Sequence, residues 1–76
     1  TTIQYDIPVE THVNLIVYDI LGREVTELEN RYFKPGIYKT TWNGRNALGN
    51  QVATGVYFYE LRTSSFSQVK KMILIK

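Results

Sequence analysis

The sequence predicts an all-β sandwich, and three observations support this prediction. Short segments in which apolar and polar residues alternate follow one another at the spacing of about 8 to 12 residues that is typical of sandwiches. Glycine, proline and asparagine separate these segments, and no window carries the apolar spacing of a helix. β-branched and aromatic residues, including six Tyr and three Phe, dominate the segments, as expected of strands.

The first two strands are predicted from their alternation. Residues 2–7 form the first, because the odd-numbered positions are all apolar and Pro8 cannot donate to a sheet ladder. Residues 13–18 form the second, and Ile16 and Tyr18 make its second half apolar on both faces. One side of each strand is therefore expected to line the core.

The next segment is harder to interpret. A turn around Gly22, which we expect to adopt a positive φ, leads into residues 24–29. Val25 and Leu28 lie three residues apart there, a spacing that fits neither a regular strand nor a full helix. We therefore predict a short strand with a bulge over these residues.

The second half of the chain predicts three further strands. The first begins at Gly36 after a Pro-Gly turn, and a polar, glycine-rich segment over residues 43–55 follows it. Residues 56–63 are the most strand-like run, and a Ser-Ser turn joins them to a last strand over residues 66–76. Residues 72–75 of that strand are apolar at every position, which predicts that it is covered on both faces.

Composition excludes several functional classes. A chain of 76 residues with 43% hydrophobic residues is expected to form one small domain, not a disordered tail. It has no cysteine, so disulfides, thiol nucleophiles and cysteine-ligated zinc are excluded. A dispersed net charge of +2 does not indicate nucleic acid as a partner. No apolar run approaches the roughly 20 residues of a membrane span, and no signal peptide pattern begins at Thr1.

The titratable residues do not suggest an enzyme. His12 is the only histidine and lies in a polar connection, and Asp6 and Asp19 are the only aspartates. A Ser-His-Asp arrangement has no support, and the five scattered glutamates suggest no catalytic pair. We predict a non-catalytic domain without metal or cofactor.

Side-chain types alone suggest two candidate binding sites. Residues 43–50 carry amide oxygens near the spacing of a calcium loop, but they include no carboxylate, and consecutive asparagine-capped turns explain them better. Aromatic residues in a small sandwich usually belong to the core. An exposed sugar-binding role is the alternative, with Phe33, Phe58 and Tyr32 as its candidates.

Four stretches together resemble a known family. In order they are TTIQYDIP, VNLIVYDILGREV, PGIYKTTWNGRNALGNQVATGVYFYEL and KKMILIK. They resemble the C-terminal sorting domain (type A) of proteins exported by the type IX secretion system. They are equally similar to the immunoglobulin-like domain of the flagellar hook-capping protein FlgD, to which that sorting domain is related. The resemblance covers essentially the whole chain.

The resemblance implies a particular fold and function. The fold is an immunoglobulin-like antiparallel β-sandwich of about seven short strands, forming a single sorting domain over residues 1–76. It is expected at the C-terminus of a longer exported protein, behind an upstream cargo domain. The implied partners are the type IX secretion machinery and a sortase-like peptidase that cleaves many members. The implied location is the medium or the outer-membrane surface of a Gram-negative-type bacterium. Members carry an Asn-Pro-rich segment before the first strand that this chain lacks, so a pairing strand upstream stays possible.

Two groups of residues carry this interpretation. Lys70, Lys71 and Lys76 match the family's basic ending, and we expect them to offer a receptor positive charge beside an open strand edge. The simpler structural interpretation is that these lysines only protect that edge. The second group consists of motif residues that determine the fold: Gly36, Tyr38, Trp42, Gly55 and Tyr57.

Two other functions remain as alternatives. The domain could be a FlgD-like or accessory assembly module that packs on a neighbour. It could instead be a carbohydrate-binding module that uses the three aromatic residues named above.

Overall fold

The computed structural model describes residues 1–75 and contains six strands with no helix. Their bounds are β1 (Thr2–Ile7), β2 (Thr11–Tyr18), β3 (Glu24–Phe33), β4 (Gly36–Thr41), β5 (Gly55–Arg62) and β6 (Ser67–Leu74). The predicted all-β sandwich is confirmed, with six strands where about seven were expected. The described residues include no helix that is long and apolar enough to traverse a bilayer.

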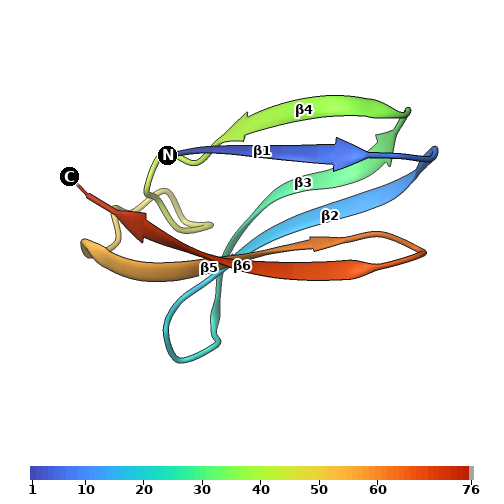
Figure 1. Cartoon of the computed structure of the whole chain (residues 1–76). Coiled ribbons are helices and arrows are strands. Elements are labelled where there is room, and N and C mark those ends of the chain that lie inside the picture. Colours follow the sequence, from blue (N-terminus) through green and yellow to red (C-terminus); the bar gives the residue numbers. More distant parts are fainter. Residues whose placement is uncertain (76) are drawn as a thin grey trace.

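The two layers of the sandwich differ in width. One sheet has four strands in the order β3-β2-β5-β6, and the other contains β1 and β4 (Figure 1). All pairs are antiparallel. A two-stranded layer cannot cover a four-stranded one completely, so part of the wider sheet's inner face stays open.

The core follows from the alternation of the strands. The odd-numbered residues of β1 face the odd-numbered residues of β2 and are buried with them. Phe33 closes this cluster, with its ring centroid 6.0 Å from that of Tyr5 and 4.7 Å from that of Tyr38, both edge-on. Edge-to-face packing of this kind adds to the stabilisation from apolar burial.

A second apolar cluster lies at the opposite end of the sandwich. Trp42 and Tyr57 pack edge-on with ring centroids 5.1 Å apart, and Val17 and Leu74 complete the cluster. The Trp42 indole N–H donates to the Arg45 carbonyl at 2.9 Å, so its polar group is satisfied. This cluster ties the strand after the Pro-Gly turn to both β5 and β6.

The strand after Gly22 is longer than predicted. Residues 24–29 were expected as a short strand, but β3 continues to Phe33. Its pairing with β2 shifts twice, because Val25 and Leu28 have no partner in the register. An extra residue of this kind is a β-bulge, and both residues pack against the core. The three-residue spacing therefore reflects two bulges in one long strand.

The prediction that the last strand is covered on both faces is wrong. β6 is the outermost strand of its sheet, and only its inner face packs, through Met72 and Leu74. Ile73 on the outer face is 57% exposed and Ile75 is 80% exposed. The run of four apolar residues does not reveal the position of the strand in its sheet. An edge strand whose outer face is uncovered can have the same composition as a central strand.

Candidate functional site

The two G-x-Y motifs have the same local geometry. The Tyr38 hydroxyl donates to the Lys34 carbonyl at 2.6 Å, and the Tyr57 hydroxyl donates to the Ala53 carbonyl at 2.6 Å. In both motifs the tyrosine reaches back four residues, past a glycine with a φ of 156° or 153°. A Cβ atom on Gly36 would lie 3.5 Å from the Tyr38 ring. These residues thus fix the starts of β4 and β5.

The lysine-bearing strand lies at an open edge. β6 pairs with β5 over eight consecutive positions without a register shift, and its other edge is unpaired within residues 1–75. Lys71 pairs with Phe58 and points to the outer face, whereas Lys70 points to the inner face. The structure therefore places these two predicted residues on opposite sides of one edge. The prediction for Lys76 falls outside the described residues.

The backbone of β6 is oriented for pairing. The Thr63 N–H donates to the Phe66 carbonyl at 2.8 Å, which makes these residues a hydrogen-bonded pair. Hydrogen-bonded pairs alternate along an antiparallel ladder, so Ser67, Val69, Lys71 and Ile73 direct their N–H and C=O groups away from β5. Such a row of free backbone groups is a template for an added strand.

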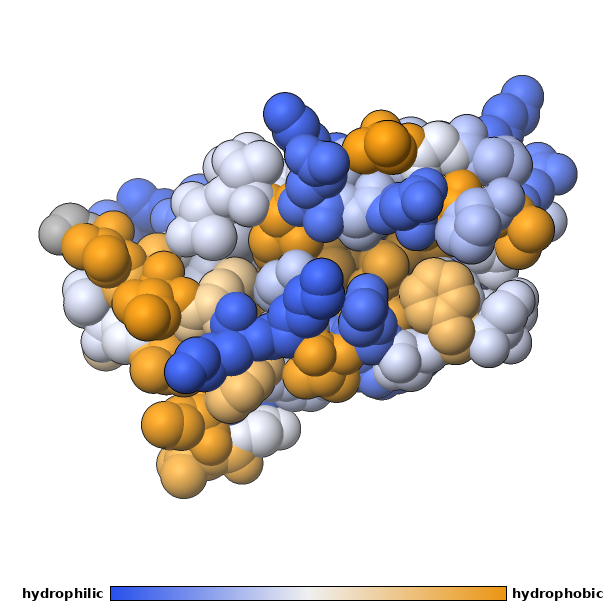
Figure 2. All heavy atoms as spheres, viewed as in Figure 1, coloured by the Kyte–Doolittle hydropathy of each residue, from blue (hydrophilic) through white to orange (hydrophobic). Residues whose placement is uncertain are grey.

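Apolar side chains accompany this free edge. Val69 is 59% exposed, and with Lys71, Ile73 and Ile75 it forms what we call the β6 edge surface. Figure 2 shows apolar side chains gathered at the end of the molecule where the end of β6 and the β2–β3 turn lie. Ile20 of that turn lines a shallow pocket with Val56, which pairs with Ile73. Lys71 of this surface was predicted from the sequence, whereas its exposed apolar residues were not.

A hydrogen-bonded carboxylate lies beside β6 on the outer face. Glu60 accepts hydrogen bonds from the Ser67 hydroxyl at 2.6 Å, Arg62 at 2.9 Å and the Tyr18 hydroxyl at 3.0 Å. The bonds from Ser67 and Arg62 hold the pKa of Glu60 below its usual value, while burial and the bond to Glu60 raise the pKa of Tyr18. A carboxylate that is ionised and fully bonded is a poor general acid or base. Its role is to tie the start of β6 to β5 and β2.

The single histidine lies at the surface of the domain. His12 is exposed, and its Nε2 atom lies 2.7 Å from the Asn30 side-chain oxygen. Within residues 1–75, no three side chains of the His, Cys, Asp and Glu type come together as metal ligands would.

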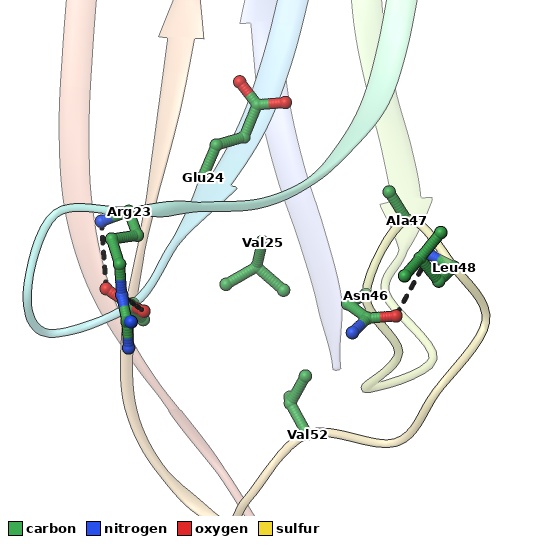
Figure 3. Close-up of a pocket in the computed structure, with 8 residues that line it drawn as sticks. Arg23, Glu24, Val25, Asn46, Ala47, Leu48 and Val52 are labelled. Atoms are coloured by element: carbon green, nitrogen blue, oxygen red, sulfur yellow. Dashed lines mark hydrogen bonds and ion pairs between the residues drawn. The ribbon is translucent and has the colours of Figure 1, made fainter.

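The loop over residues 43–50 is a series of turns. The Asn46 side-chain oxygen accepts the N–H groups of Leu48 and Asn50, both at 3.0 Å. The Ala47 N–H donates to the Val25 carbonyl, which anchors the loop to β3. A hollow of about 410 Å³ lies between this loop and the β2–β3 turn, and Figure 3 shows Val25 and Val52 pointing into it while the Glu24 carboxylate points away. The asparagine oxygens thus cap backbone groups, as expected for turns.

One of the three aromatic residues considered for sugar binding is buried in the core. Phe33 is 1% exposed and belongs to the core, because it occupies an inward position at the end of β3. Tyr32 and Phe58 both lie on the outer face, but they pair with His12 and Tyr18 of β2, roughly 20 Å apart along the strand. The three residues therefore do not form a common stacking platform.

Comparison with known protein families identifies the domain. A model of the FlgD Ig-like domain matches residues 1–66. The chain belongs to the FlgD Ig-like domain family. No curated protein and no solved structure matches the chain.

Membership of the FlgD Ig-like family agrees with the observed fold. The match includes both G-x-Y motifs and Trp42, and Ig-like domains of this kind are typically non-catalytic. It ends at Phe66, directly before β6. The comparisons support the FlgD-related part of the resemblance and give no support to the sorting-domain part.

Proposed function

We propose that this domain is a non-catalytic assembly module that docks an extended strand of a partner protein on the β6 edge surface. The observation that carries the proposal is the regular, unpaired edge of β6, which combines free backbone groups with exposed apolar side chains. Strand addition of this kind takes its affinity from main-chain hydrogen bonds and its specificity from alternate side chains.

The other edge of the same sheet is less suitable. β3 is the opposite edge strand, and its two bulges interrupt the row of free backbone groups. Bulges at an edge are a common protection against unwanted pairing. β6 has no bulge within its eight pairs, so it offers the longer continuous template.

The side chains of β6 indicate the chemistry of the partner. Val69 and Ile73 flank Lys71 on the outer face, and Lys70 lies beside it on the inner face. Neither lysine has an ion pair within residues 1–75. Cross-strand pairs favour apolar residues opposite apolar ones and acids opposite bases. The expected partner strand carries two adjacent acidic residues flanked by apolar ones.

A peptide titration tests this proposal. The probe is a blocked peptide with two adjacent glutamates flanked on each side by valines, added to isotopically labelled protein. The largest NMR shifts are expected in the amides of Val69 and Lys71, because those N–H groups form the new ladder. Val69→Pro removes one such N–H without breaking a bond to β5, and the affinity is expected to fall about tenfold.

The matched controls use the same peptide. A version with lysines in place of the glutamates is expected to bind more weakly, because it faces like charges. Tyr32→Pro removes an outward N–H from the β3 edge, because Tyr32 lies between two positions that bond to β2, and it is expected to leave the affinity unchanged. The proposal fails if the peptide causes no shifts in β6, or if Val69→Pro binds it as tightly as the unmodified chain.

The type IX sorting signal is the second candidate function, and the exposed lysines of β6 favour it. A secretion receptor could read Lys70 and Lys71 beside the same free edge. The domain would then direct an upstream cargo domain to the medium or the outer-membrane surface, where a sortase-like peptidase would act on it.

A reporter fusion in a type IX-competent cell separates the two candidates. If the domain is a sorting signal, the fused reporter is exported, and Lys70→Glu with Lys71→Glu keeps it inside. Circular dichroism of the purified variant checks that the fold is retained. If the unmodified fusion stays inside the cell, the sorting function is excluded and the assembly function is unaffected.

A further inference from the structure

A groove lies between β1 and the β5–β6 hairpin. It exists because the two-stranded layer is narrower than the sheet it covers, so β1 does not reach across the inner face of β6. Its volume is about 290 Å³. We call it the β1 groove, and its principal lining residues are Gln4, Asp6, Tyr59, Leu61, Phe66 and Lys70.

One wall of the β1 groove offers backbone groups that have no strand partner within residues 1–75. The Thr1 amino group donates to the Trp42 carbonyl at 3.2 Å, and the Trp42 N–H donates to the Thr1 carbonyl at 2.8 Å. Because hydrogen-bonded pairs alternate, the odd-numbered residues of β1 bond to β4. The N–H and C=O groups of Thr2, Gln4 and Asp6 therefore point away from β4, and the last two of these residues line the groove.

The side chains on the floor and far wall of the β1 groove indicate the chemistry of an occupant beside β1. Tyr59 is half-buried and Leu61 is buried, while Phe66 is partly exposed at one end, so the floor is mainly apolar. Lys70 projects from the inner face of β6 and has no ion pair within residues 1–75. An occupant with an apolar underside and one acidic side chain would match both features.

We propose that the β1 groove binds an extended acidic segment of a partner protein as a third strand of the β1–β4 sheet. The segment hydrogen-bonds to Gln4 and Asp6, places an apolar side chain on Tyr59, and pairs a carboxylate with Lys70. Lys70 and Asp6 are the charged side chains that line the groove, and they come from its opposite walls, so the occupant places its carboxylate at the Lys70 wall and away from Asp6. The added strand belongs to the other sheet, and the site shares Lys70 with the partner strand proposed for the β6 edge surface.

Amide hydrogen exchange tests the proposal. In the free domain the amides of Gln4 and Asp6 are expected to exchange much faster than those of Ile3 and Tyr5, which bond to β4. The probe is the blocked pentapeptide Val-Thr-Glu-Thr-Val, whose valines and glutamate share one face and which, centred between Gln4 and Asp6, ends before Thr2. Its binding is expected to slow exchange at Gln4 and Asp6 by about tenfold or more.

Proline variants provide the matched comparison. Gln4→Pro removes an outward N–H within the groove, and the affinity is expected to fall about tenfold. Thr2→Pro removes an equivalent N–H from the same strand outside the groove, and a change below about twofold is expected. Lys70→Glu is expected to reverse the preference, so that a probe with lysine in place of glutamate binds better.

Three results would overturn the proposal. The first is equal loss of affinity in Gln4→Pro and Thr2→Pro. The second is peptide binding that protects Val69 and Lys71 and leaves Gln4 unchanged, which would assign the peptide to the β6 edge surface alone. The third is protection of Gln4 and Asp6 without peptide in a longer natural polypeptide that contains this domain, because the occupant would then belong to the same chain.

Discussion

Truncation after Phe66 is expected to unfold the domain, although residues 1–66 include the whole family match. The truncation removes β6, and with it Met72 and Leu74, which pack against the cluster around Trp42. Burial of each such side chain contributes about 1.5–3 kcal/mol. The cut also leaves β5 as an unpaired edge and uncovers Tyr57. A domain of this size has a total stability of roughly 4–11 kcal/mol, so the combined loss approaches the whole.

The measurement is far-ultraviolet circular dichroism together with the dispersion of amide NMR signals. A chain that ends at Ile75 keeps all of β6 and serves as the control, and it is expected to unfold cooperatively like the full chain. Cooperative unfolding of the chain that ends at Phe66 would refute the prediction. The result also matters for experiments on function, because deleting the C-terminal lysines together with Met72 and Leu74 would test folding and not docking.

Local patterns were sufficient to predict most strands and the core they form. The bounds of the first strand follow from alternation and from Pro8, and that strand is observed at Thr2–Ile7 as predicted. Aromatic residues were expected to belong to the core, and the rings of Trp42 and Tyr57 meet there. These features depend on residues close in sequence, where the two-residue period of a strand is a direct signal.

Features that depend on pairing between distant segments could not be predicted. The sequence gives no order of strands in a sheet, so the outermost position of β6 and the exposure of Ile73 were missed. The β1 groove was missed for the same reason, because it arises from the unequal width of two layers. The bulges at Val25 and Leu28 were only partly visible, since a bulge is defined by the partner strand as well.

Replacement of Trp42 by alanine is expected to have the largest effect of any single substitution. The side chain is 1% exposed, packs edge-on against Tyr57, and satisfies the Arg45 carbonyl through its indole N–H. Removing a buried aromatic side chain costs about 3–5 kcal/mol, because apolar contacts are lost and a cavity remains. Against a total of roughly 4–11 kcal/mol, Trp42→Ala is expected to leave a large fraction of the chain unfolded.

Two further variants separate the causes of this loss of stability. The free energy of unfolding is measured by urea unfolding followed by circular dichroism. Trp42→Phe keeps ring packing on Tyr57 but leaves the Arg45 carbonyl without its donor, so a smaller cost of about 1–3 kcal/mol is expected. Tyr32→Ala removes an aromatic side chain that is 60% exposed, and a change within about 0.5 kcal/mol is expected. If Trp42→Ala were no more harmful than Tyr32→Ala, the cluster of Trp42, Tyr57 and Leu74 would not hold the two sheets together. Truncation after Phe66 would then no longer be expected to unfold the domain, because that expectation depends on the same cluster.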